Sequence, residues 1–180
     1  MPIVGCTPEN APLFETFYAE LLDRLEPFVQ TDTFLFGSRP SLADFGLYGQ
    51  LNTMATDPTP ARLINERAPR TVRWVRRLHD GSGIEGQWDR SPSSAAIALV
   101  ELAGRYYLPF LAANLRAIEA GNKTLQVELN RHPYTQPVFR YQAKCYDFLR
   151  RRYASFPQSA RARLDLVLSD TDCLRYLSDV

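Results

Sequence analysis

Apolar residues recur three and four positions apart along most of this 180-residue sequence. Residues 12–29 show the pattern most fully, with apolar side chains on one wide face and charged side chains on the other, which predicts an amphipathic α-helix. Residues 124–129 alternate instead between polar and apolar side chains, which predicts a strand that returns over residues 134–136. The sequence therefore predicts an all-α fold with one small β-hairpin near residues 124–136.

Residues 41–51 contain a signal for the start of a helix. Ser41 is followed three positions later by Asp44, the pattern of a capping box in which each side chain accepts a hydrogen bond from the other residue's amide. The helix that follows is apolar on nearly every side, which is typical of a helix buried among others. Gly46 and Gly49 each cost about 1 kcal/mol relative to alanine, a cost that close approach of neighbouring helices would explain. We predict a central buried helix with Ser41 and Asp44 as its structural cap, in preference to a chemical role for Asp44.

A glycine-rich loop at residues 80–92 divides the chain. We expect a helical core over residues 1–82 and a helical extension over residues 83–180, packed as one unit with the core. Inside the extension, a long helix over residues 93–119 contains Pro109, which should kink it.

The composition excludes several classes of function. A formal net charge of +1 lacks the strong bias that is typical of proteins that bind nucleic acid or a membrane surface. The three cysteines have no CxxC spacing, and His79 and His132 are far apart, so no metal-binding motif is present. No signal-peptide pattern is found, and no window reaches the roughly 18 apolar residues of a membrane span. We expect a cytoplasmic protein with no metal, no nucleic acid and no membrane as partners.

Residues 9–80 resemble the C-terminal all-helical domain of cytosolic glutathione transferases. Three features carry the resemblance in order: the amphipathic helix of residues 12–29, the Ser41–Asp44 box with its apolar helix, and the segment Ala68-Pro69-Arg70-Thr71-Val72-Arg73-Trp74. The resemblance implies a glutathione-transferase C-terminal-like helical bundle with a helical extension. It also implies that this domain supplies a pocket for a small hydrophobic electrophile and a surface for a homodimer.

Transferases of this family carry in addition an N-terminal thioredoxin-like domain, which binds glutathione and holds the residue that activates its thiol. The present sequence contains no such pattern. The resemblance therefore implies that glutathione would be a co-substrate only with a thioredoxin-like domain supplied in cis or in trans. We expect this chain alone to be inactive and to hold no catalytic residue. Cys6 has neither a CxxC partner nor a neighbouring histidine, and we favour an inert thiol over a nucleophile.

Within this framework the candidate substrate-binding residues lie on the apolar helix. They are Tyr48, Asn52 one turn later, and Met54 near its end. Each has a plain structural alternative: Tyr48 as a core aromatic whose hydroxyl is hydrogen-bonded, and Asn52 as a hydrogen-bonding residue at the helix end.

The sequence also fits a second class of function and disfavours a third. A non-catalytic protein-interaction module of the same fold fits the aromatic-rich second half of the chain, because aromatic residues are enriched at interfaces. An acyl-transfer hydrolase is disfavoured, because no Gly-x-Ser-x-Gly motif is present. The arginines of residues 67–77 could form an anion site, but we favour a solvated helix face.

Overall fold

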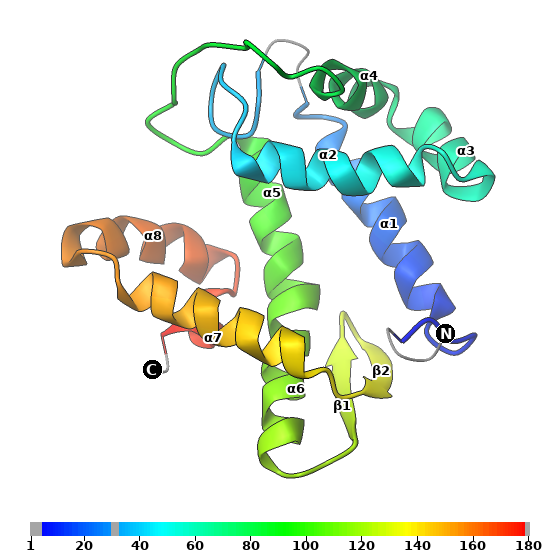
Figure 1. The fold of residues 1–180 in the computed structure, drawn as a ribbon, viewed down its shortest axis with the longest axis vertical. Helices are drawn as coiled ribbons and strands as arrows, with labels where there is room; N and C mark the ends of the chain where they lie inside the picture. Colours follow the sequence, from blue (N-terminus) through cyan, green and yellow to red (C-terminus); the bar gives the residue numbers. More distant parts are fainter. Residues whose placement is uncertain (1–4, 30–32, 179–180) are drawn as a thin grey trace. The chain divides into compact units, whose positions relative to one another are not determined.

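The computed structural model describes residues 5–29 and 33–178 (Figure 1). Its elements are, in order, α1 (Ala11–Leu25), α2 (Leu42–Met54), α3 (Pro58–Arg67), α4 (Pro69–Leu78), α5 (Ser94–Leu102), a π-helical turn (Ala103–Tyr107), α6 (Leu108–Glu119), β1 (Thr124–Leu129), β2 (His132–Pro137), α7 (Arg140–Ala154), α8 (Gln158–Asp170) and α9 (Leu174–Leu177). The predicted all-α fold with one small hairpin is confirmed.

The chain forms two compact units, and each is described by itself. The first, Thr16–Leu99, contains most of α1, all of α2, α3 and α4, and the start of α5. Helix α4 packs against both α2 and α3. The most deeply buried side chains of this unit are Leu22, Leu25, Leu51, Ile64, Thr71, Asp44 and Leu78. Burial of such aliphatic side chains is the main favourable term in folding of this unit.

The second unit combines Met1–Glu15 with Val100–Val180. Helix α6 is its centre and packs against β1 and α7 (Figure 1). It also packs against α9. The Asn114 side chain of α6 is fully buried. Its Nδ2 donates to the Phe139 carbonyl at 2.9 Å, and its Oδ1 accepts from the Phe139 amide at 2.8 Å. This pair of bonds satisfies a buried amide and fixes the start of α7 against α6.

The irregularity expected at Pro109 takes the form of the π-helical turn before it. The Leu108 amide donates to the Ala103 carbonyl, five residues back. Proline has no amide hydrogen and its ring crowds the carbonyl four residues earlier. The wider turn relieves that conflict while the helix continues into α6. Gly104 lies inside this turn and is buried.

One helix among the described residues, Ser94–Glu119, is long and apolar enough to cross a membrane by length and composition, with a mean hydropathy of 1.3. Half of its most apolar window is buried inside the structure. A core helix of a soluble protein passes the same test.

Helix α2 differs from its prediction as a buried helix. Its buried residues are Asp44 and Leu51, whereas Leu42 is 89% exposed. A Cβ built at Gly46 or Gly49 would meet nothing within 4 Å. The two glycines therefore do not serve a close helix contact within the described residues. The prediction of burial on every side was wrong because an apolar composition does not specify which neighbours are present to cover it.

The hairpin turns tightly. Asn130 and Arg131 join the strands and have φ values of 47° and 67°, as a two-residue hairpin turn with both central residues in the left-handed region requires. Leu125 and Leu129 of β1 are buried, and β1 packs on α6. A two-stranded hairpin is marginally stable alone, so this packing stabilises it.

Tyr134 of β2 gives this unit an expected alkaline sensitivity. Burial raises the pKa of its hydroxyl to about 12, and the hydroxyl donates to Gln136 Oε1 at 2.6 Å. Between about pH 10 and 12 the unfolded state loses this proton first, so stability that is complete below pH 10 should fall as the pH rises, by at most about 1.4 kcal/mol per pH unit. Urea denaturation of the wild type and Tyr134→Phe across this range measures the difference. Equal slopes for the two proteins would contradict the expectation.

Candidate functional site

The capping box of α2 is present with all of its hydrogen bonds. Asp44 is fully buried. Its Oδ2 accepts from the Ser41 amide at 2.8 Å and from Ser41 Oγ at 2.5 Å, and its Oδ1 accepts from the Leu35 amide at 2.8 Å. The Asp44 amide in turn donates to Ser41 Oγ at 3.4 Å. The carboxylate therefore joins the segment before α2 to the helix start, and its oxygens are occupied by structural bonds.

Tyr48 contacts a histidine that sequence reasoning did not connect with it. The Tyr48 hydroxyl and His79 Nδ1 lie 2.9 Å apart, and the two rings meet edge to face with centroids 6.3 Å apart. Tyr48 is half-buried against the core, whereas His79 is exposed just after α4. A hydroxyl beside an imidazole can exchange a hydrogen bond with a ligand. No sequence motif links Tyr48 with His79, because the two residues are 31 positions apart.

Asn52 and Met54, the other two candidate substrate-binding residues, lie on different sides of α2. Asn52 follows Tyr48 by four residues and shares its face, since a helix turns by about 100° per residue. Met54 lies about 200° around the helix from Asn52 on the same geometry. Met54 packs against the core. The helix therefore brings Tyr48 and Asn52 together and turns Met54 away from them.

An apolar surface lies on the same helix. We call Leu42, Phe45, Gly46 and Gly49 the α2 face. Leu42 is 89% exposed and Phe45 42% exposed, and the two glycines present bare backbone. The backbone at Gly81 approaches the ring of Phe45, because a Cβ built there would come within 3.0 Å of it. The α2 face is thus bounded by the loop that follows α4.

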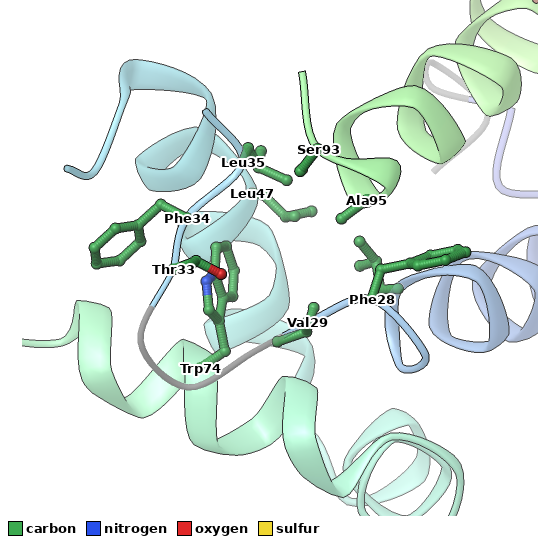
Figure 2. Close-up of a pocket in the computed structure, with 10 residues that line it drawn as sticks. Phe28, Val29, Thr33, Phe34, Leu35, Leu47, Trp74, Ser93 and Ala95 are labelled. Atoms are coloured by element: carbon green, nitrogen blue, oxygen red, sulfur yellow. The ribbon is translucent and has the colours of Figure 1, made fainter. Parts of the chain in front are cut away.

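The first unit also contains a small cavity, shown in Figure 2. Its volume is about 20 Å³, which is room for about one water molecule. It is lined by Leu25, Phe28, Val29, Thr33, Phe34, Leu35, Leu47, Trp74, Ser93 and Ala95. Tyr48, Asn52 and Met54 are not among these lining residues, and the space does not hold a tripeptide such as glutathione.

Two of the arginines near α4, Arg67 and Arg77, make contacts with different partners. Arg67 makes a two-pronged ion pair with Asp23, at 3.0 and 2.5 Å. The Arg77 guanidinium lies 4.7 Å from the ring centroid of Phe34. These contacts hold the Arg67 and Arg77 side chains in different places, so these two arginines do not meet at one anion. Across residues 5–29 and 33–178, no group of three or more His, Cys, Asp or Glu side chains could hold a metal ion.

The first helices match a known family of protein domains. Residues 8–77 match the family model described as "Glutathione S-transferase, C-terminal domain". This part of the chain is therefore similar to that domain. The matched residues contain α1, α2, α3 and nearly all of α4. Comparison with curated proteins and with solved structures gave no match.

Proposed function

We propose that this chain acts as the C-terminal part of a glutathione S-transferase and supplies the binding surface for a small hydrophobic electrophile. In this proposal a thioredoxin-like domain, in cis or in trans, holds glutathione. The glutathione thiolate attacks the electrophilic carbon; a carbon–sulfur bond forms and the leaving group departs with its electron pair. The proposal includes a homodimer, a cytoplasmic location and a role in detoxification.

The exposed α2 face carries the proposal. The apolar side chains of Leu42 and Phe45 are exposed to solvent. Contiguous exposed apolar surface on a soluble domain is a sign of a binding site or an interface. Gly46 and Gly49 allow a ligand or a second domain to approach the helix backbone closely. The family assignment of residues 8–77 supports glutathione chemistry in general.

We assign distinct tasks to the three candidate residues. The Tyr48 hydroxyl, which lies 2.9 Å from His79 Nδ1, would donate a hydrogen bond to the electrophile. Asn52 lies one turn further along α2, on the same side of the helix as Tyr48. Met54, which packs against the core, would contribute indirectly: its flexible thioether lets the helix repack when a ligand binds. None of the three activates the thiol, so the isolated chain should not conjugate an aromatic halide faster than buffer does.

The test follows the chain by NMR during titration with glutathione and, separately, with an aromatic halide. The halide is expected to shift the Tyr48 ring and Met54 methyl signals, and glutathione alone is expected to shift neither. Tyr48→Leu should weaken halide binding by about tenfold, the loss of one well-placed contact of about 1.4 kcal/mol. Tyr141→Leu removes an exposed tyrosine elsewhere and should leave binding unchanged. If Tyr48→Leu binds the halide as tightly as the wild type does, the assignment of Tyr48 is refuted. Conjugation of the halide by the isolated chain would refute the assignment of thiol activation to another domain.

The interaction-module alternative is supported by a separate surface. Tyr141 and Phe148 of α7 are 64% and 67% exposed and lie on one side of that helix, seven residues apart. If neither glutathione nor the halide perturbs any signal of the chain, a non-catalytic binding role becomes the better account.

A further inference from the structure

The register of the hairpin shows which way the backbone groups of β1 point. Pro133 faces Glu128 and Pro137 faces Thr124. Proline has no amide hydrogen, so these are non-hydrogen-bonded pairs, and the alternation of an antiparallel ladder makes the pair at Gln126 another. The amides and carbonyls of these three β1 residues therefore point away from β2.

Two hydrogen bonds beside the strands support this alternation. The Val138 amide donates to the Lys123 carbonyl at 3.0 Å, so Lys123 is bonded toward the β2 side and the residue after it faces outward. The Thr135 carbonyl, opposite Gln126, accepts from Asn10 Nδ2 at 3.0 Å on the far edge of β2. Both strands therefore follow the pattern that the prolines require.

The two edges of the hairpin differ in how they are protected. The β2 edge has two prolines, which lack donors, and is covered by the segment that contains Asn10. Prolines and covering segments are the usual protection of an edge against another strand. On the β1 edge, no hydrogen bond within residues 5–29 and 33–178 reaches the outward backbone groups of Gln126 or Glu128. An extended chain can therefore join the hairpin at β1.

A groove of about 550 Å³ lies where this edge meets α6. Its lining includes small and basic side chains of α6 and residues at the start of β1: Ala113, Arg116, Ala117, Ala120, Lys123 and Gln126. Alanines three and four positions apart lie on one side of a helix. They leave space there for the side chains of an added strand.

Arg116 and Lys123 make the groove basic. Both side chains are exposed, and neither forms an ion pair within the part of the chain that the structure describes. The end of α6 does not need them as caps, because its last carbonyls accept from the amides of Asn122 and Gly121, at 2.9 and 3.0 Å. These are the two bonds of a Schellman motif. The two cations can therefore meet a negatively charged partner.

The alternation of side chains along β1 decides where that negative charge must lie. Leu125 and Leu129 are buried, and the residues at the alternate positions are exposed. Lys123 precedes Leu125 by two residues, so it continues the side that faces α6. Residues opposite each other in paired strands share a side. Partner residues opposite Lys123 and Leu125 would therefore both face α6.

The spacing of the two cations matches these two partner positions. Helix α6 and β1 pack against each other and run in opposite directions (Figure 1). From Ala120 back to Arg116 the helix rises about 6 Å, and from Lys123 to Leu125 the strand rises about 7 Å. Lys123 therefore serves the first partner position and Arg116 the second.

We propose that the β1 edge binds an extended segment of a partner protein that carries two acidic residues two positions apart. Its backbone pairs with the outward groups of Gln126 and Glu128, and its two carboxylates meet Lys123 and Arg116. Opposite Glu128 the partner has a basic or neutral residue, because like charges directly opposite are destabilising. A second copy of β1 does not fit, because its Glu128 lies on the side away from α6. A third strand also stabilises a hairpin that is marginal alone.

The first test uses the capped peptide Lys-Val-Thr-Glu-Thr-Glu, followed by NMR of the full chain. Paired antiparallel, its last glutamate lies opposite Lys123 and its lysine opposite Glu128. The amides of Gln126 and Glu128 should shift as they gain acceptors, and the Val127 amide, which points to β2, should shift less. We expect a Kd between about 10 μM and 1 mM. Weaker binding, or shifts that leave out the amides of Gln126 and Glu128, would overturn the proposal.

The second test changes the charges of the groove. Arg116→Gln and Lys123→Gln should each weaken binding of the peptide about two- to fivefold, the effect of one exposed ion pair. Arg163→Gln removes an exposed arginine of α8 and should leave binding unchanged. The double variant Arg116→Glu with Lys123→Glu should instead bind Lys-Val-Thr-Lys-Thr-Lys, which the wild type should not bind. If the double variant keeps its affinity for the glutamate peptide, the charge pairing is wrong.

The third test removes one outward donor. Gln126→Pro deletes an amide hydrogen that the hairpin does not use, and Gln126→Thr keeps it in a residue that favours strands. Binding should weaken about tenfold in Gln126→Pro, because a carbonyl of the peptide loses its donor, and persist in Gln126→Thr. A folded Gln126→Pro that binds as the wild type does would exclude strand pairing.

Two further outcomes would assign the groove to another occupant and reject the peptide. One is a single-stranded oligonucleotide that shifts the same amides as strongly as the peptide does. The other is the same shifts on concentrating the chain alone. The charge variants do not depend on folding of the proline variant. The site lies outside residues 8–77 and its tests need no glutathione, so a failure here is separate from a failure of the conjugation proposal.

Discussion

Replacing Asp44 by alanine is expected to lower the free energy of unfolding of the Thr16–Leu99 unit by about 3 kcal/mol. The carboxylate is fully buried and accepts from the amides of Leu35 and Ser41 and from Ser41 Oγ. Loss of a helix cap costs about 0.5–2 kcal/mol. The substitution also leaves a buried amide donor at Leu35 without an acceptor, which adds about 1–3 kcal/mol.

Asp57→Ala is the matched control for this substitution. Asp57 caps α3 through one bond, from the Thr59 amide to its Oδ1 at 3.1 Å, and is exposed. Its loss should cost about 0.5–1 kcal/mol, because water replaces the lost bond. Urea denaturation followed by fluorescence of Trp74, which is 3% exposed, reports on this unit. If the two substitutions lower the free energy of unfolding by similar amounts, the larger contribution of Asp44 to stability is refuted.

Gly104→Ala should destabilise the second unit by about 2 kcal/mol. A Cβ at Gly104 would lie 2.1 Å from the Thr171 carbonyl oxygen and 3.1 Å from Cys173 Sγ. A backbone carbonyl cannot turn away as a side chain can, so the π-helical turn and the Thr171–Cys173 segment must separate. Overpacking costs about 1–3 kcal/mol, and a contact as short as 2.1 Å to a backbone oxygen belongs at the upper end of that range. Subtracting the gain of about 1 kcal/mol that alanine brings to a helix leaves the net loss of about 2 kcal/mol.

Cys173 reports the separation directly. Its side chain is 1% exposed and its Sγ contacts the Val100 carbonyl at 3.3 Å. In a background without Cys6 and Cys145, Gly104→Ala should make the remaining thiol react faster with a disulfide reagent. Gly49→Ala is the control of opposite sign: nothing lies within 4 Å of its Cβ, so it should stabilise α2 by about 0.5–1 kcal/mol. Unchanged thiol reactivity in Gly104→Ala would contradict the close contact.

The candidate site could be predicted from sequence only in part. Tyr48 and Asn52 share a face because the helix repeat fixes their spacing. The contact of Tyr48 with His79 depends on the packing of α2 against α4, which no local pattern encodes. The hairpin lies between these cases: Pro133 and Pro137 are visible in the sequence, but the residues that they face, Glu128 and Thr124, follow only from the register of the paired strands.

The sequence by itself determined the local structure of this protein. Ser41 and Asp44 specify where α2 begins, the alternation of residues 124–129 specifies a strand, and Gly121, with φ of 71°, ends α6, because capping, side-chain period and backbone sterics act over a few residues. Tertiary structure decided what each element meets. The apolar α2 was predicted to be buried, yet Leu42 is exposed; Gly104 was unremarkable in sequence, yet it lies against Thr171. Burial depends on which distant segments pack nearby, and that is settled by the whole fold.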